Sequence, residues 1–84
     1  MKYEKTYLVQ DTFNNTQDDL TADEVIDQAQ YWVGELLSDQ QNNSANEKAY
    51  YLNQKALLDD TAVNRLSKIE AAREILEIIN INVY

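Results

Sequence analysis

Charged side chains set the chemistry that is open to this chain. Its 84 residues include 15 Asp and Glu, 7 Lys and Arg, and no histidine or cysteine. The usual general base and the usual transition-metal ligands are therefore missing. Carboxylates alone can hydrolyse glycosidic bonds, but only where two of them flank a substrate cleft, and so short a chain has little room for one. We therefore expect a protein that is not an enzyme and that needs no metal or cofactor.

One adjacent pair of carboxylates, Asp59 and Asp60, invites an acid–base interpretation. Thr61 follows the pair, and these residues separate two predicted helices. Asp and Thr at such a break commonly form a tight turn and cap the next helix, because their side chains accept hydrogen bonds from nearby backbone N–H groups. We favour the turn. Nucleotide-binding glycine motifs are excluded, since the chain has a single glycine.

The acidic residues are concentrated in the first half of the chain, where no Lys or Arg occurs between Lys5 and Lys48. Within this stretch, apolar residues recur at helical spacing along one side of a helix predicted for residues 22–38. The opposite side, which we call the acidic face, combines carboxylates with one tyrosine. It consists of Asp23, Glu24, Asp27, Tyr31 and Glu35, with Asp18, Asp19 and Asp39 at its rim.

Two interpretations of the acidic face are open. It is either a solvated surface, with acids placed where the helix dipole favours them, or a binding surface in which charge surrounds an aromatic anchor. A formal net charge of −8 disfavours direct contact with nucleic acid or with an anionic membrane. If the face binds anything, we expect a protein partner with a basic surface.

Carboxylates spaced along a helix can imitate phosphates toward a basic groove. In its short length, its lack of cysteine and its acid-only stretch from residue 11 to 47, the chain resembles small acidic proteins of phages and mobile elements. These include anti-CRISPR, antirestriction and uracil-DNA-glycosylase inhibitors. The resemblance is one of class and implies a stoichiometric inhibitor that covers the DNA-binding or catalytic surface of a nuclease or other DNA-binding protein.

The predicted second helix, residues 45–58, supports an alternative function. It carries apolar residues on several sides, which is typical of a helix that is central to the fold or shared with another molecule. The core interpretation is favoured. The alternative is a helical adaptor, assembly or immunity-type protein, either monomeric or homodimeric, that acts through an apolar surface. That surface would consist of Tyr50, Tyr51, Leu57 and Leu58.

Capping boxes mark where two of the helices begin. Thr21 with Glu24, and Ser44 with Glu47, have the spacing in which two residues cap each other reciprocally at a helix N-terminus. Leu20 lies just before the first helix, as expected of a hydrophobic staple. A third helix is predicted for residues 62–78. In the second helix, a stripe of small side chains is expected to pack closely against a neighbour. It consists of Ala45, Ala49, Leu52 and Ala56.

The two ends of the chain are predicted to be extended. Residues 2–9 are rich in β-formers, and residues 79–83 alternate apolar and polar side chains, so we expect two strands that pair with each other. A frayed extension of the third helix is the alternative for 79–83. Residues 11–19 are predicted to form a loop from which Phe13 folds back onto the core.

These elements make one domain, residues 1–84, of the α+β class and mainly α. The absence of proline favours long helices over a turn-rich β fold. No stretch has the length of a membrane span, and the N-terminus lacks the apolar core of a signal peptide. We therefore expect a cytoplasmic protein.

Overall fold

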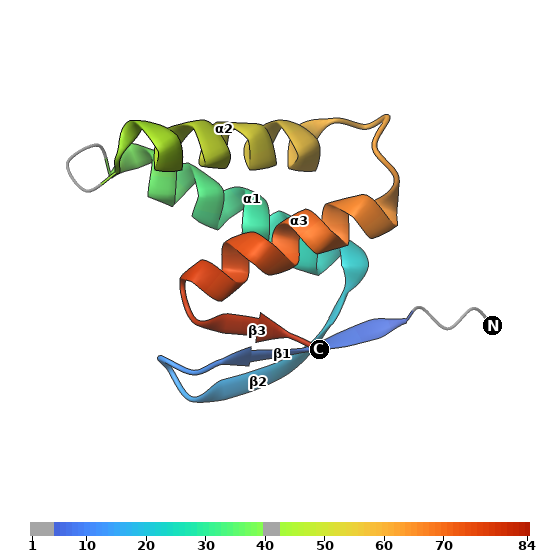
Figure 1. The fold of residues 1–84 in the computed structure, drawn as a ribbon. Coiled ribbons are helices and arrows are strands. Elements are labelled where there is room, and N and C mark those ends of the chain that lie inside the picture. Colours follow the sequence, from blue (N-terminus) through green and yellow to red (C-terminus); the bar gives the residue numbers. More distant parts are fainter. Residues whose placement is uncertain (1–4, 40–42) are drawn as a thin grey trace.

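The computed structural model describes residues 5–39 and 43–84 and confirms the α+β, mainly α class (Figure 1). The first helix has its predicted bounds, and the second helix and the C-terminal strand lie close to their predicted positions. Residues 2–4 of the predicted first strand lie outside the described residues, as do residues 40–42 of the break between the first two helices. The elements in chain order are β1 (Thr6–Asp11), β2 (Thr16–Thr21), α1 (Ala22–Ser38), α2 (Ala45–Asp59), α3 (Arg65–Ile78) and β3 (Ile81–Val83).

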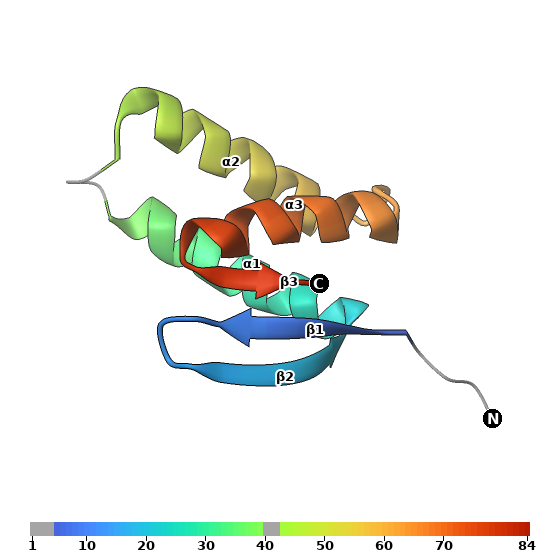
Figure 2. The ribbon, with the colours of Figure 1, turned by 60° about the horizontal axis from the view of Figure 1, so that its bottom comes forward.

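The elements form three layers (Figures 1 and 2). The sheet is covered on one face by α1 and α3, and α2 packs on the far side of these two helices. The core lies between the layers, and its most deeply buried large side chains are Val25, Val33, Leu58, Ile75 and Leu76. None of the helices within the described residues is both long and apolar enough to cross a membrane.

The sheet is antiparallel with the strand order β2-β1-β3. Val9 of the central strand lies opposite Val83 of β3, so the predicted pairing of the two ends of the chain is confirmed. The C-terminal strand begins at Ile81 rather than at residue 79. Asn80 has a φ of 65°, the left-handed conformation that commonly ends a helix, and it turns the chain from α3 into β3.

The predicted loop over residues 11–19 is wrong, because Thr16–Thr21 is the strand β2. Only four residues connect β1 to β2. The Asp11 carboxylate accepts hydrogen bonds from the backbone N–H of Phe13 at 3.0 Å and of Asn14 at 3.1 Å, and from the Asn14 side chain at 2.8 Å. This closes a tight turn. Phe13 sits at its tip and is 85% exposed, so it does not fold back onto the core.

The third helix begins at Arg65, three residues later than predicted. Its N-cap is Asn64, whose side-chain oxygen accepts from the backbone N–H of Ser67 at 2.8 Å. Asp60 forms a turn instead, since its carboxylate accepts from the backbone N–H of Ala62 at 2.9 Å. Asp60 therefore forms the predicted turn. The predicted helix cap is wrong, because the N-cap of α3 is Asn64.

The small-residue stripe predicted to pack α2 against a neighbour is exposed. The buried side of α2 instead carries Tyr51, Gln54 and Leu58. Gln54 is polar, yet only 4% exposed, because its Nε2 donates a 2.6 Å hydrogen bond to the carboxylate of Glu74 on α3. A buried amide is stable when it is hydrogen-bonded. The exposed stripe consists of Ala45, Ala49, Leu52 and Ala56.

Acidification is expected to weaken the β1–β2 hairpin. The hydrogen bonds from Asn14 and Phe13 favour the charged carboxylate and lower the pKa of Asp11. The stabilisation is therefore present above the pKa of an unfolded Asp and is lost as the pH falls through the lower folded pKa. Thermal unfolding at a series of acidic pH values should show a shallower pH dependence for Asp11→Ala than for the wild type.

Asp18→Ala is the matched control, because it removes a carboxylate from the same hairpin without touching the turn. Equal pH dependence in the wild type and Asp11→Ala would contradict the role of this turn.

Candidate functional site

The outward side of α1 presents the acidic face. Val25, Ala29 and Val33 of this helix are fully buried, and this fixes which side of the helix meets solvent. Glu24, Asp27, Tyr31 and Glu35 are all exposed on the opposite side. The structure therefore brings together the core of the face that the sequence predicts.

Tyr31 is the aromatic centre of the acidic face and is 61% exposed. Its ring contacts the half-buried ring of Trp32 edge-on, with ring centroids 5.0 Å apart and an angle of 80° between the planes. Such edge-to-face pairs are favourable. Tyr31 thus presents an exposed aromatic surface between carboxylates.

The N-terminus of α1 is fixed by the predicted capping box. The Thr21 hydroxyl accepts from the backbone N–H of Glu24 at 3.3 Å, and the Glu24 carboxylate accepts from the backbone N–H of Thr21 at 3.0 Å. Glu24 therefore serves the fold as well as the surface charge. Leu20 and Val25 flank the cap and both pack against the core, as the staple predicts.

Asp23 differs from the other acids of the face. Its carboxylate lies 3.3 Å from the guanidinium of Arg65 on α3, and both side chains are more than half exposed. Exposed pairs of this kind contribute little to stability, but they reduce the negative potential around the acid. Asp23 is therefore at the partly neutralised margin of the acidic face.

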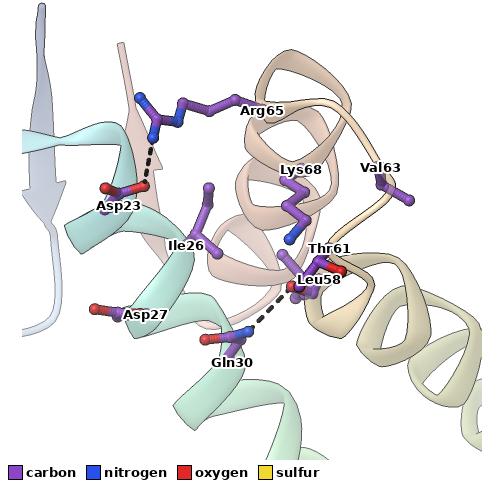
Figure 3. A pocket seen from close by; sticks show the side chains of 9 residues that line it. All are labelled: Asp23, Ile26, Asp27, Gln30, Leu58, Thr61, Val63, Arg65 and Lys68. Carbon is purple, nitrogen blue, oxygen red and sulfur yellow. Dashed lines mark hydrogen bonds and ion pairs between the residues drawn. The ribbon is translucent and has the colours of Figure 1, made fainter.

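A pocket of about 430 Å³ lies along this margin, between α1, the end of α2 and the start of α3 (Figure 3). The Nε2 of Gln30 crosses it to donate to the Leu58 carbonyl at 3.0 Å and to the Asp59 carboxylate at 3.1 Å. Figure 3 shows the Lys68 amine turned into the pocket. The lining residues are Asp23, Ile26, Asp27, Gln30, Leu58, Thr61, Val63, Arg65 and Lys68.

The pocket lies where the three helices meet. Its carboxylates come from α1 and its cations from α3, and the Gln30 hydrogen bonds tie α1 to α2. In the part of the chain that the structure describes, no three acidic side chains are grouped so that they could hold a metal ion. The acidic residues of α1 and the basic residues of α3 thus face each other across this pocket.

The rim residues do not form a ring. Asp18 lies opposite Val9, whose buried side chain faces the helices, whereas Asp19 lies opposite Leu8 and points to the uncovered face of the sheet. Asp39 caps the far end of α1, about 25 Å along the helix axis from β2. The structure thus separates Asp39 from the other two, and Asp18 and Asp19 from each other.

Searches against protein families, curated proteins and solved structures found no match to this chain.

The alternative apolar interface on α2 is not a surface. Tyr51 is 5% exposed and Leu58 is fully buried, so both belong to the core. Leu57 packs against the core and is partly buried. Tyr50 is 38% exposed, and burial together with the neighbouring Glu74 raises its pKa. The predicted interface of Tyr50, Tyr51, Leu57 and Leu58 is therefore wrong. Of these four residues, only Tyr50 is exposed.

Two surface features were missed by the sequence analysis. One is the exposed edge of β2, which was assigned to a loop. The other is the outward side of α2, where Leu52 is 54% exposed. The hydrogen-bonding capacity of Asp11 and Asn14 next to a β-rich stretch is the one local signal that could have indicated a hairpin.

Two leucines of α2 provide a test of the corrected core. We expect Leu58→Ala to lower the free energy of unfolding by about 2–5 kcal/mol, because it leaves a cavity at a fully buried position. Leu52→Ala is the matched control and should change it by less than about 0.5 kcal/mol. Urea unfolding followed by circular dichroism measures both. Similar losses of unfolding free energy in the two variants would contradict the assignment of Leu58 to the core and of Leu52 to the surface.

The capping box is expected to stabilise the helix that carries the acidic face. Thr21→Ala should cost about 1 kcal/mol, since the backbone N–H of Glu24 loses its acceptor. Thr21→Ser keeps a hydroxyl and should retain most of the stability. Chemical denaturation of the three proteins makes the comparison, and an unchanged Thr21→Ala protein would mean that the cap contributes nothing.

Proposed function

We propose that this protein is a non-enzymatic, stoichiometric inhibitor or modulator that binds a basic surface of a nucleic-acid-handling protein. The observation that carries the proposal is the outward side of α1. There Glu24, Asp27 and Glu35 surround the exposed Tyr31 on a helix that contains no Lys or Arg. The basic residues after the first strand all lie on α2 and α3. They are Lys48, Lys55, Arg65, Lys68 and Arg73.

The spacing of the carboxylates suits a surface that normally receives phosphates. Glu24 and Asp27 are separated by about 4.5 Å along the helix axis, and Asp27 and Glu35 by about 12 Å. This is a lower charge density than that of one DNA strand, which carries a charge every ~3.4 Å. Tyr31 fills the longer interval with a ring that can cover apolar parts of the partner surface. The proposed face therefore imitates phosphate charge in part and adds an anchor that DNA lacks.

Electrostatics and rigidity both support the proposal. An acid-only surface raises the rate of encounter with a basic groove through long-range attraction. The face is carried by a helix that is capped and packed on four elements, so little backbone freedom is lost on binding. A protein bound in such a groove would exclude nucleic acid from it. The phage or mobile-element context and the cytoplasmic location are part of this proposal.

The structure shows which side chains of the acidic face can be changed without disturbing other interactions. Asp23 and Glu24 are unsuitable, because one pairs with Arg65 and the other completes the capping box. Asp27→Lys, Tyr31→Ala and Glu35→Lys alter exposed side chains and leave both interactions intact. A matched control carries the same changes on other elements. It combines Glu70→Lys, Glu77→Lys and Tyr84→Ala, all at exposed positions.

The test is a pull-down from a nuclease-treated bacterial lysate with the three proteins, after circular dichroism has shown equal helicity. We expect the wild type and the control to capture the same nuclease, repair or other DNA-binding protein and the α1 variant to lose it. Capture should weaken steeply between about 0.05 and about 0.5 M salt, because exposed charges are screened. Added double-stranded DNA should displace the captured protein. Equal capture by all three proteins, or by none, would refute the proposal.

A further inference from the structure

The strand β2 is an edge strand, and both faces of its residues 16–19 are open to solvent. The order β2-β1-β3 leaves one side of β2 without a neighbouring strand (Figure 2). Side chains 16–19 are all exposed, whichever face of the sheet they point to. Neither a helix nor a loop of the described chain therefore covers this part of the strand. An uncovered edge of this kind is a template for pairing with another strand.

The pairing pattern shows which backbone groups of β2 point outward. The Leu8 carbonyl accepts from the backbone N–H of Tyr84, so the even-numbered residues of β1 face β3. The odd-numbered residues of β1 therefore face β2, and they lie opposite residues 16, 18 and 20. Gln17 and Asp19 consequently direct their N–H and C=O groups away from the sheet. The N–H of Thr21, the next outward residue, already donates to Glu24.

A second copy of the chain fits this edge poorly. One of the two antiparallel registers with the longest overlap places Gln17 opposite Asp19 of the second copy, and Asp18 opposite its own equivalent. Carboxylates directly opposite each other on neighbouring strands are destabilising. A shift of register by two residues instead places Asp19 opposite Asp19. The charges that oppose self-pairing are those that attract a basic strand.

We propose that the outer edge of β2 docks an extended, basic segment of the partner protein as a fourth strand of the sheet. Gln17 and Asp19 supply the backbone hydrogen bonds. Side chains of directly opposed residues share a face of the sheet, so residues opposite Asp18 and Asp19 lie one on each face. The segment is therefore recognised by two consecutive Lys or Arg residues within a short β-forming sequence. This inference rests on the proposed function in taking the partner to be basic.

The probe is a capped peptide of about six residues with a central Lys-Arg pair between Val and Thr residues. Two control peptides carry either Glu in place of the basic pair or N-methyl groups on the backbone amides that would face β2. Backbone amide NMR of the wild-type protein should show the largest shifts and slowed hydrogen exchange at Gln17 and Asp19. Both control peptides should bind at least about tenfold more weakly.

Protein variants separate the edge from the acidic face. Gln17→Pro removes an outward N–H that takes no part in pairing with β1 and should weaken peptide binding at least about tenfold, whereas Gln17→Thr should leave it unchanged within about twofold. The N-methylated peptide makes the same comparison with an unaltered protein if Gln17→Pro fails to fold.

Three results would overturn the inference. If the shifts are confined to Asp27, Tyr31 and Glu35, and Gln17→Pro binds normally, basic partners use the acidic face alone and the proposed function survives without the strand. Absence of saturable binding also overturns it. So does sedimentation of the free wild type as a dimer with Gln17→Pro monomeric, since the occupant is then a second copy. Failure of the proposed function is a separate result, seen as equal capture by the α1 variant and the wild type.

Discussion

Reciprocal capping at Thr21 is the interaction on which the arrangement of this protein depends. Thr21 is the last residue of β2 and also the N-cap of α1, so no linker separates strand from helix. The two hydrogen bonds with Glu24 fix the angle at which the chain leaves the sheet. Leu20 and Val25 pack on the core at either side of this junction. The junction sets the start of α1 over the sheet, and the shared core then packs α2 and α3 against α1.

The charge distribution of the surface is a consequence of that packing. Val25, Ala29 and Val33 must be buried, so the carboxylates between them along the helix must face solvent, because an uncompensated buried charge is very costly. Solvation alone explains why the acids are outside. It does not explain why α1 carries no cation, while α2 contains an internal pair between Lys55 and Asp59. Repulsion within α1 reduces stability, and this cost is what a binding function would account for.

Local signals in the sequence predicted the parts of the fold that local interactions determine. The Thr21 and Ser44 capping boxes and the apolar side of α1 were identified correctly, and the residues named as the core of the acidic face are exposed together on that helix. The strand β2 was missed because its residues 16–19 are exposed on both faces and show no alternation. The buried side of α2 was misassigned because Gln54 is polar, and its partner Glu74 comes from another helix. The error in α2 concerns a contact with a distant segment of the chain, whereas β2 is held by pairing with the adjacent strand β1.

The same junction makes β2 and α1 a single rigid unit with two kinds of recognition. The strand edge offers directional backbone hydrogen bonds, and the helix offers charge and the Tyr31 ring. A partner that engages both gains from the second contact without a further loss of rotational freedom, since the first contact already holds it in place. Because no hinge lies between Asp19 and Asp27, only a partner with matching spacing gains in this way. Charge alone would attract many basic proteins, and under the proposed function the fixed geometry of the Thr21 junction would supply the selectivity among them.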